Sequence, residues 1–216
     1  MHIPDGVLSG SAAGIAVLGA GVVLAAAGTA IGLARTDYHH MPRVAMLSSA
    51  FFVASLINIP VGTMNFHPVL NGLMGLVLGW AAFPAMLVAL FLQTIFFGFG
   101  GLTTLGLNTL DMALPAVACH YAFRWAMHSP RERVVFVAAV GAGACSILLS
   151  ACLMAASFAL AGEEFGLVSR MTLLAYPPIA LIEGILTASV VVFLRRVRPE
   201  LLLTPGPPCP VELSHG

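Results

Sequence analysis

The chain has 216 residues, of which 59% are hydrophobic and only 8% are charged, and its mean hydropathy is +0.99. A water-soluble domain does not cover its surface with so few charges, so this composition excludes a soluble globular protein and predicts an integral membrane protein. Nine arginines balance nine acidic residues, and this neutral balance gives no sign of a nucleic-acid partner.

The chain begins Met1-His2, and a free amino terminus followed directly by histidine can chelate a transition metal. The α-amine, the deprotonated amide nitrogen of residue 2 and the imidazole of His2 would form two fused rings around one ion. They leave one corner of a square plane vacant, which suits Ni(II) or Cu(II); an incidental histidine is the alternative. The first residues carry no positive charge and the following apolar run is long, so we expect no cleaved signal peptide and a retained Met1.

Apolar runs along the chain predict an all-α, polytopic membrane protein with seven transmembrane helices. The region 68–98 is too long for one helix and is interrupted before Pro84, so we expect two short helices there. One long helix in this region would give six spans instead. The seven expected spans are Gly10–Ala34, Arg43–Ile59, Pro68–Trp80, Pro84–Phe97, Thr109–Met127, Val134–Ala161 and Met171–Leu194.

The arginines favour seven spans over six. With the N-terminus outside and the C-terminus cytoplasmic, eight of the nine arginines lie on the cytoplasmic side and only Arg170 lies outside. Six spans would move six of those eight across the membrane and remove the positive-inside bias. In the seven-span topology the loop 60–67 lies on the same side as Met1, which makes His67 the one internal histidine there.

Several polar residues are candidates to support a metal site. A metal-bound imidazole usually donates its second nitrogen to a nearby acceptor, although turn formation explains some of these side chains equally well. The outer-side candidates are Asp5, Asn65, Asn71 and Asn108. Glu183 falls within the last span, where a carboxylate is a candidate functional group that either pairs with His120 or lines the exit route of the ion. A protonated packing residue is the alternative.

Two further segments differ from the apolar spans. The glycine-rich stretch 99–106 has no charge and lacks the lysine of a phosphate-binding loop, so we expect an irregular segment buried in protein and no bound nucleotide. Residues 199–216 are rich in proline and predict a disordered cytoplasmic tail. Residues 1–198 are then one membrane domain, with an extracellular segment at residues 1–9.

Three motifs together resemble the CbiM/NikM family: Met1-His2-Ile3-Pro4-Asp5-Gly6, His67-Pro-Val-Leu-Asn-Gly72, and Phe97-Gly-Phe-Gly-Gly-Leu-Thr-Thr-Leu-Gly106 followed by Asn108. This family comprises the substrate-binding components of energy-coupling-factor (ECF) transporters for cobalt and nickel, and the resemblance runs from residue 1 to about residue 198. It implies seven helices and an N-terminal segment that tucks into them. It also implies a square-planar nitrogen site made by Met1, His2 and His67.

The same resemblance implies partners and a location. The partners are a transmembrane coupling component, cytoplasmic ATPase subunits and a small accessory membrane subunit, in a prokaryotic cell membrane. The opening Pro4-Asp5-Gly6 and the residues 62–67 look more like the nickel type, and d⁸ Ni(II) gains more from an amide donor than Co(II) does. The transported substrate is therefore expected to be Ni²⁺, with Co²⁺ for cobalamin supply as the alternative.

A secondary permease and a membrane metalloenzyme are the two alternative classes of protein. A stand-alone secondary permease would show inverted repeats and charged residues along several spans, and the sequence shows no repeat. A membrane metalloenzyme would need an open coordination position and a general base, whereas four nitrogens in a plane close the site. We therefore expect a transport protein that is not an enzyme.

Overall fold

The computed structural model describes residues 2–57, 59–61, 64–66 and 68–202, and within them the chain is almost entirely helical. Strands β1 and β2 pair as one antiparallel hairpin, with Pro60 opposite Asn65. The elements are α1 (Ala12–Ala34), α2 (Met41–Ala54), β1 (Ile59–Val61), β2 (Met64–Phe66), α3 (Asn71–Leu78), α4 (Ala82–Phe97), α5 (Leu105–Met127), α6 (Glu132–Ala161) and α7 (Gly166–Val197).

The helices form a bundle whose outer surface is apolar. In the described part of the chain, four helical stretches are long and apolar enough to cross a membrane: α1, the stretch Asn71–Phe97, α6 and the stretch Glu163–Val197. Large side chains such as Leu174, at 74% exposure, point away from the bundle. Because lipid tails solvate such side chains and water does not, this surface is that of a multi-pass membrane protein.

The stretch between α3 and α4 confirms the expected pair of short helices. Gly79 has a φ of 54°, and the short 3₁₀ helix η2 (Gly79–Ala81) separates the two. At this point the Arg43 guanidinium donates to the carbonyl oxygen of Val77 at 2.7 Å. The far end of α4 instead leads to the loop that contacts the N-terminal segment, so the chain reverses direction at η2.

The hairpin and the end of α2 differ from the expected boundaries. The span expected to reach Ile59 ends as helix at Ala54, and strands occupy part of a region expected to be a plain loop. Pro60 explains why helix does not include Ile59, because a proline disfavours helical backbone at the residue before it. Nothing in the sequence explains why α2 ends as early as Ala54. The other helices begin or end within a few residues of the expected spans.

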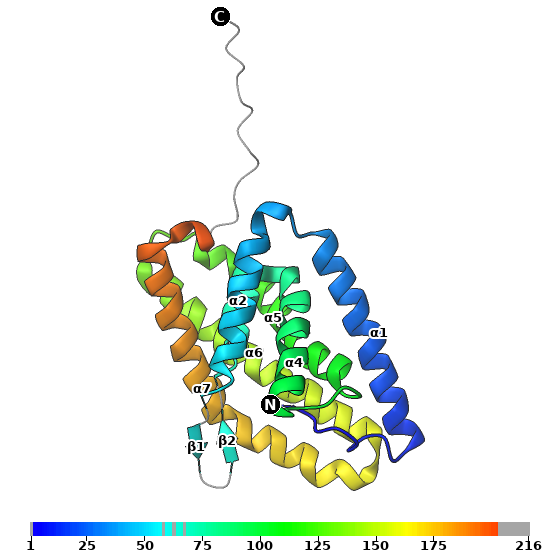
Figure 1. Cartoon of the computed structure of the whole chain (residues 1–216). Coiled ribbons are helices and arrows are strands. Elements are labelled where there is room, and N and C mark those ends of the chain that lie inside the picture. The colour runs from blue at the N-terminus through cyan, green and yellow to red at the C-terminus, as the bar shows by residue number, and fades with distance from the viewer. Residues whose placement is uncertain (1, 58, 62–63, 67, 203–216) are drawn as a thin grey trace, which may run out of the picture.

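The two ends of the bundle differ in charge. The N-terminal segment, the hairpin and the α4–α5 loop lie at one end, and the α1–α2 connection and the end of α7 lie at the other (Figure 1). At this second end an ion pair joins Arg196 of α7 to Glu132 of α6 at 2.6 Å. The end is called the arginine end below, because it carries Arg35, Arg43, Arg124, Arg131, Arg133, Arg195, Arg196 and Arg198.

The start of the expected tail packs on the bundle. Pro199–Leu201 form the short 3₁₀ helix η4, the carbonyl oxygen of Leu201 accepts from Arg43, and Leu202 is buried. The packed part of the chain therefore extends through Leu202, a few residues into the expected tail. Residues 203–216, the rest of the expected tail, lie outside the described residues.

Candidate metal centre at the N-terminal segment

Ile3 anchors the N-terminal segment inside the bundle. Its side chain is 0% exposed, and its amide donates to Asn108 Oδ1 at 2.9 Å. Its carbonyl oxygen accepts from Thr104 Oγ1 at 2.9 Å and from Asn108 Nδ2 at 3.2 Å. Since both polar backbone groups of Ile3 are bonded to buried side chains, the residue just before it is held against the beginning of α5.

Asp5 makes a second attachment, to the loop between α4 and α5. Its amide donates to the carbonyl oxygen of Gly100 at 3.1 Å. Its carboxylate accepts from the Thr103 amide at 3.3 Å and from the Thr103 hydroxyl. The segment from Ile3 to Asp5 therefore lies along this loop, with Leu8 buried behind it.

The glycines of the α4–α5 loop make room for the segment. Gly100 has a φ of 75°, a conformation that L side chains rarely adopt. A Cβ atom at Gly101 would lie 2.3 Å from Asp5 Cβ, a distance that no real pair of atoms tolerates. The segment expected to be irregular and buried is irregular up to Thr104, but Leu102 and Thr103 are exposed and α5 begins at Leu105. The glycines fit the backbone of the N-terminal segment.

His2 lies half-buried between Ile3 and the loop. Its imidazole stacks on the ring of Phe99, with 6.4 Å between the ring centroids and 14° between the planes. Because the Ile3 amide is engaged by Asn108, the nearest nitrogens on the N-terminal side of the anchor are the amide and imidazole of His2. These are the donors that the chelate of the sequence analysis requires at this position.

The other two expected ligands, Met1 and His67, lie outside the described residues. Across residues 2–202 with their gaps, no three histidine, cysteine or acidic side chains lie close enough together to hold a metal ion. A site within this segment would therefore use backbone and imidazole nitrogens rather than a carboxylate or thiolate cluster. The complete four-nitrogen arrangement stays a prediction.

Glu183 fixes the backbone that follows residue 67. From α7, its carboxylate accepts from the Val69 amide at 3.2 Å and from the Asn71 amide at 3.0 Å. The residue before α3, Leu70, has a φ of 53° and no side-chain oxygen, so it cannot cap the helix itself. Glu183 supplies the missing acceptors from another helix.

The remaining candidates occupy different places. Asp5 and Asn108 both hold the N-terminal segment, as described above. Asn71 begins α3 and donates to Ser150 Oγ at 3.1 Å. Asn65 lies in β2, and only its backbone is among the described parts of the structure. His120 Nδ1 contacts the carbonyl oxygen of Gly75 at 3.0 Å, so His120 and Glu183 bind different groups.

Sequence reasoning did not single out the hydroxyls of Thr103 and Thr104. Both lie in an otherwise apolar, glycine-rich loop, and the four-residue spacing of Thr104 and Asn108 puts them on one helical face. Two neighbouring polar side chains in such a loop were a usable signal. Asp111, one turn after Asn108, is a buried carboxylate that the sequence motifs do not include.

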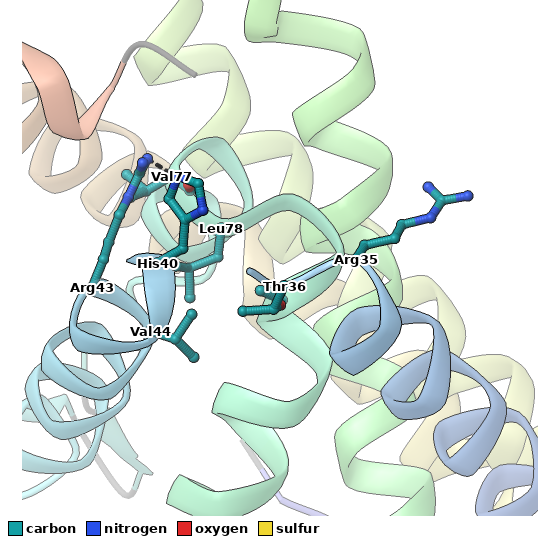
Figure 2. Close-up of a pocket in the computed structure, with 8 residues that line it drawn as sticks. Arg35, Thr36, His40, Arg43, Val44, Val77 and Leu78 are labelled. Carbon is teal, nitrogen blue, oxygen red and sulfur yellow. Dashed lines mark hydrogen bonds between the residues drawn. The ribbon is translucent and has the colours of Figure 1, made fainter. Parts of the chain in front are cut away.

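A separate cavity lies at the arginine end and is less suited to a cation. Its volume is about 240 Å³, and it is lined by Arg35, Thr36, His40, Arg43, Val44, Val77, Leu78 and Ala81. Figure 2 shows the Arg43 guanidinium beside Val77, while Arg35 points away from the other residues drawn. The guanidinium of Arg35 lies over the Trp80 ring, 5.3 Å from its centroid. Two guanidinium groups repel a divalent cation, so the N-terminal segment is the better candidate.

Several known proteins are similar to this sequence over most of its length. Residues 2–201 match the family described as "Cobalt uptake substrate-specific transmembrane region". A Haemophilus influenzae protein whose name assigns it provisionally to metal transport is 40% identical over 205 residues, which cover 94% of this chain and 97% of that protein. The fused nickel transport protein NikMN of Rhodobacter capsulatus is 35% identical over 237 residues, with 94% of this chain and 64% of the relative covered.

The cobalt transport protein CbiM of Sorangium cellulosum is 31% identical over 175 residues, with 77% of this chain and 78% of the relative covered. The fold has a solved counterpart as well. A crystal structure of a transition metal transporter superimposes with a TM-score of 0.71 at 26% identity, covering 91% of this chain and 93% of that chain. The chain therefore belongs to the CbiM family of cobalt-uptake substrate-specific membrane proteins.

Proposed function

We propose that this chain captures Ni²⁺ at the outer face of the cell membrane, as the substrate-binding component of an ATP-driven ECF uptake transporter. In this proposal it spans the membrane seven times, with the N-terminus outside and the C-terminus in the cytoplasm. The anchoring of Ile3 by Asn108 and Thr104 carries the proposal. It holds a terminal segment, which would otherwise move freely, in a fixed position within the bundle.

The donors of the proposed site are four nitrogens: the Met1 amine, the amide and imidazole of His2, and the imidazole of His67. A deprotonated amide is a strong-field ligand, and square-planar d⁸ Ni(II) gains more from it than Co(II) does. The bonds between Asn108 and Ile3 support this set, because they hold the backbone directly after His2 in place. Phe99 covers one face of the imidazole.

Co²⁺ is the second candidate substrate. The named relatives include a cobalt transport protein and a fused nickel transport protein, and they support both ions. The chemistry of the donor set is the reason to favour nickel. Either ion is cargo in this proposal, and no enzymatic step is involved.

The proposed partners are a transmembrane coupling component, cytoplasmic ATPase subunits and a small accessory membrane subunit. The glycine-rich loop 99–106 lacks the lysine of a phosphate-binding loop and instead contacts the N-terminal segment. This supports ATP hydrolysis by separate ATPase subunits. A stand-alone secondary permease is the alternative of a different class.

The test is made on the full chain, purified with its native N-terminus and loaded with Ni²⁺. We expect one nickel per chain and the yellow, diamagnetic spectrum of a square-planar complex. His67→Ala, and separately one residue added before Met1, should each abolish this spectrum and leave the protein folded. His128→Ala is the matched control, because His128 is exposed at the arginine end and should not affect binding.

An unchanged spectrum in the extended protein would show that the α-amine is not a ligand. Uptake of radioactive nickel by cells then separates the two classes of transporter. Cells that carry this chain with the partner ATPases should accumulate nickel, and cells that carry it without them should not. Equal uptake in both would favour the permease.

A further inference from the structure

Asp111 is a buried carboxylate that the proposed capture site does not use. The residue is 3% exposed, and its Oδ2 atom has no hydrogen-bond partner among the described residues. Removing an ionised carboxylate from water without a compensating charge or hydrogen bond is strongly unfavourable. In a membrane protein such a group marks an ion pathway more often than a packing position.

Its place in the fold is directly inward of the N-terminal segment. Asp111 follows Asn108 by three residues on α5, so it lies about one helical turn, roughly 5 Å, further along the axis. Since α5 runs from the N-terminal segment to the arginine end, Asp111 is on the inner side of the anchor. An ion that leaves His2 towards the arginine end would meet this level of α5 first.

A second unsatisfied oxygen lies at the same level, on α3. Cβ atoms at Gly75 and Gly79 would lie 2.2 Å from the Ala116 carbonyl oxygen and 3.2 Å from His120 Nε2, so α3 and α5 run in the same direction. One turn back along both helices, Asn71 reaches the level of Asp111. Asn71 is 0% exposed, and in the described structure its Oδ1 atom has no partner.

Helices α6 and α7 also contribute polar groups near this level. The Asn71 side chain is oriented by its bond to Ser150 of α6. Tyr176 of α7 donates to the sulfur of Met154 of α6 at 3.8 Å. The Glu183 carboxylate accepts from the backbone amides of Val69 and Asn71 at the start of α3.

We propose that the Asp111 carboxylate and Asn71 Oδ1 form a second, weaker position for a divalent transition-metal ion, which the ion occupies after it leaves the N-terminal nitrogens. This proposal rests on the proposed function, because it places the second position on the route of the same cargo. Carboxylate and amide oxygens bind Ni²⁺ or Co²⁺ more weakly than a deprotonated amide nitrogen does. A weak oxygen site is therefore suited to passing the ion on rather than to retaining it.

The test is Asp111→Asn, which keeps the size of the side chain and removes its charge. The purified variant should bind one Ni²⁺ with the parent's spectrum and affinity, and nickel uptake by cells with the partner subunits should fall at least ten-fold. Glu132→Gln is the control for loss of a carboxylate, since Glu132 forms an exposed ion pair at the arginine end. Its uptake should equal that of the parent.

Parent-like uptake by Asp111→Asn would overturn the proposal. Loss of both bound nickel and uptake would also overturn it, because Asp111 would then support the capture site or the fold. These outcomes differ from failure of the proposed function, in which the parent protein itself binds no nickel or takes none up.

Discussion

At the scale of single residues, the N-terminal segment is held largely by its backbone, with one side-chain attachment from the Asp5 carboxylate to Thr103. The amide and carbonyl groups of Ile3 form hydrogen bonds with Asn108 of α5, and the Asp5 amide donates to the carbonyl oxygen of Gly100. Backbone bonds of this kind do not depend on the side chains of the segment. They depend instead on how closely the α4–α5 loop can approach, which glycine at positions 100 and 101 allows.

Gly101→Ala should therefore weaken metal binding. The new Cβ atom would lie 2.3 Å from Asp5 Cβ, so the segment must move away from the loop. We expect nickel affinity, measured by calorimetry, to fall at least ten-fold while the protein stays folded. Gly10→Ala is the matched control, because a Cβ atom there meets nothing within 4 Å. Equal losses in both variants would contradict this account.

Much of the candidate site follows from the sequence at this scale. The pair Met1-His2, the glycine-rich loop and Asn108 all carry recognisable signals, and the structure brings His2, this loop and Asn108 together. The bond between Ile3 and Asn108 has no such signal, because it uses backbone atoms that every residue has. The two residues are also 105 positions apart, so only the fold brings them into contact.

At the scale of elements, the short helix α3 depends on a carboxylate from α7. The amides of Val69 and Asn71 would be buried without acceptors if Glu183 were absent. A helix of eight residues has few hydrogen bonds of its own, so these two bonds matter more than they would in a long helix. They also fix the chain that leads from the hairpin into the bundle.

Glu183→Ala should destabilise the protein, by roughly 1–3 kcal/mol for each buried amide left without an acceptor. Glu183→Gln keeps one carbonyl oxygen and should lose about half as much. The measurement is the unfolding free energy in detergent, with Glu164→Ala as the exposed control on the same side of the bundle. Equal stability of Glu183→Ala and Glu164→Ala would show that the cap contributes nothing.

Helix positions were predictable from apolar runs, and the break before Pro84 was predictable from length. The hairpin was not, because strands of three residues are too short for an alternating pattern to stand out. The link between Glu183 and α3 was not predictable either, since it joins positions 112 residues apart. Sequence alone placed Glu183 in a helix and left its partner open.

At the scale of the whole molecule, charge separates the two ends of the bundle. Eight of nine arginines lie at the end where α7 ends, and the N-terminal segment lies at the other end. The positive-inside rule predicts that the arginine end faces the cytoplasm. A metal ion outside the cell would then encounter the segment that carries His2 at the outer face of the membrane.

Cysteine labelling checks this orientation in intact cells. In a background without the four native cysteines, Glu164→Cys should react with a membrane-impermeant maleimide. His128→Cys, at the arginine end, should react only after the cells are permeabilised. Both residues are exposed, so a difference in labelling reports the side of the membrane. Labelling of His128→Cys alone in intact cells would reverse the proposed topology.

The anchoring of Ile3 has a practical consequence for anyone who purifies this protein. The anchoring bonds begin at Ile3, so an affinity tag fused before Met1 should leave these bonds and the fold intact. The tagged protein would pass every test of folding, yet the proposed capture site would lack its amine. A metal-free preparation of that kind would look like a family member that does not bind nickel, so the tag belongs after Leu202, at the opposite end.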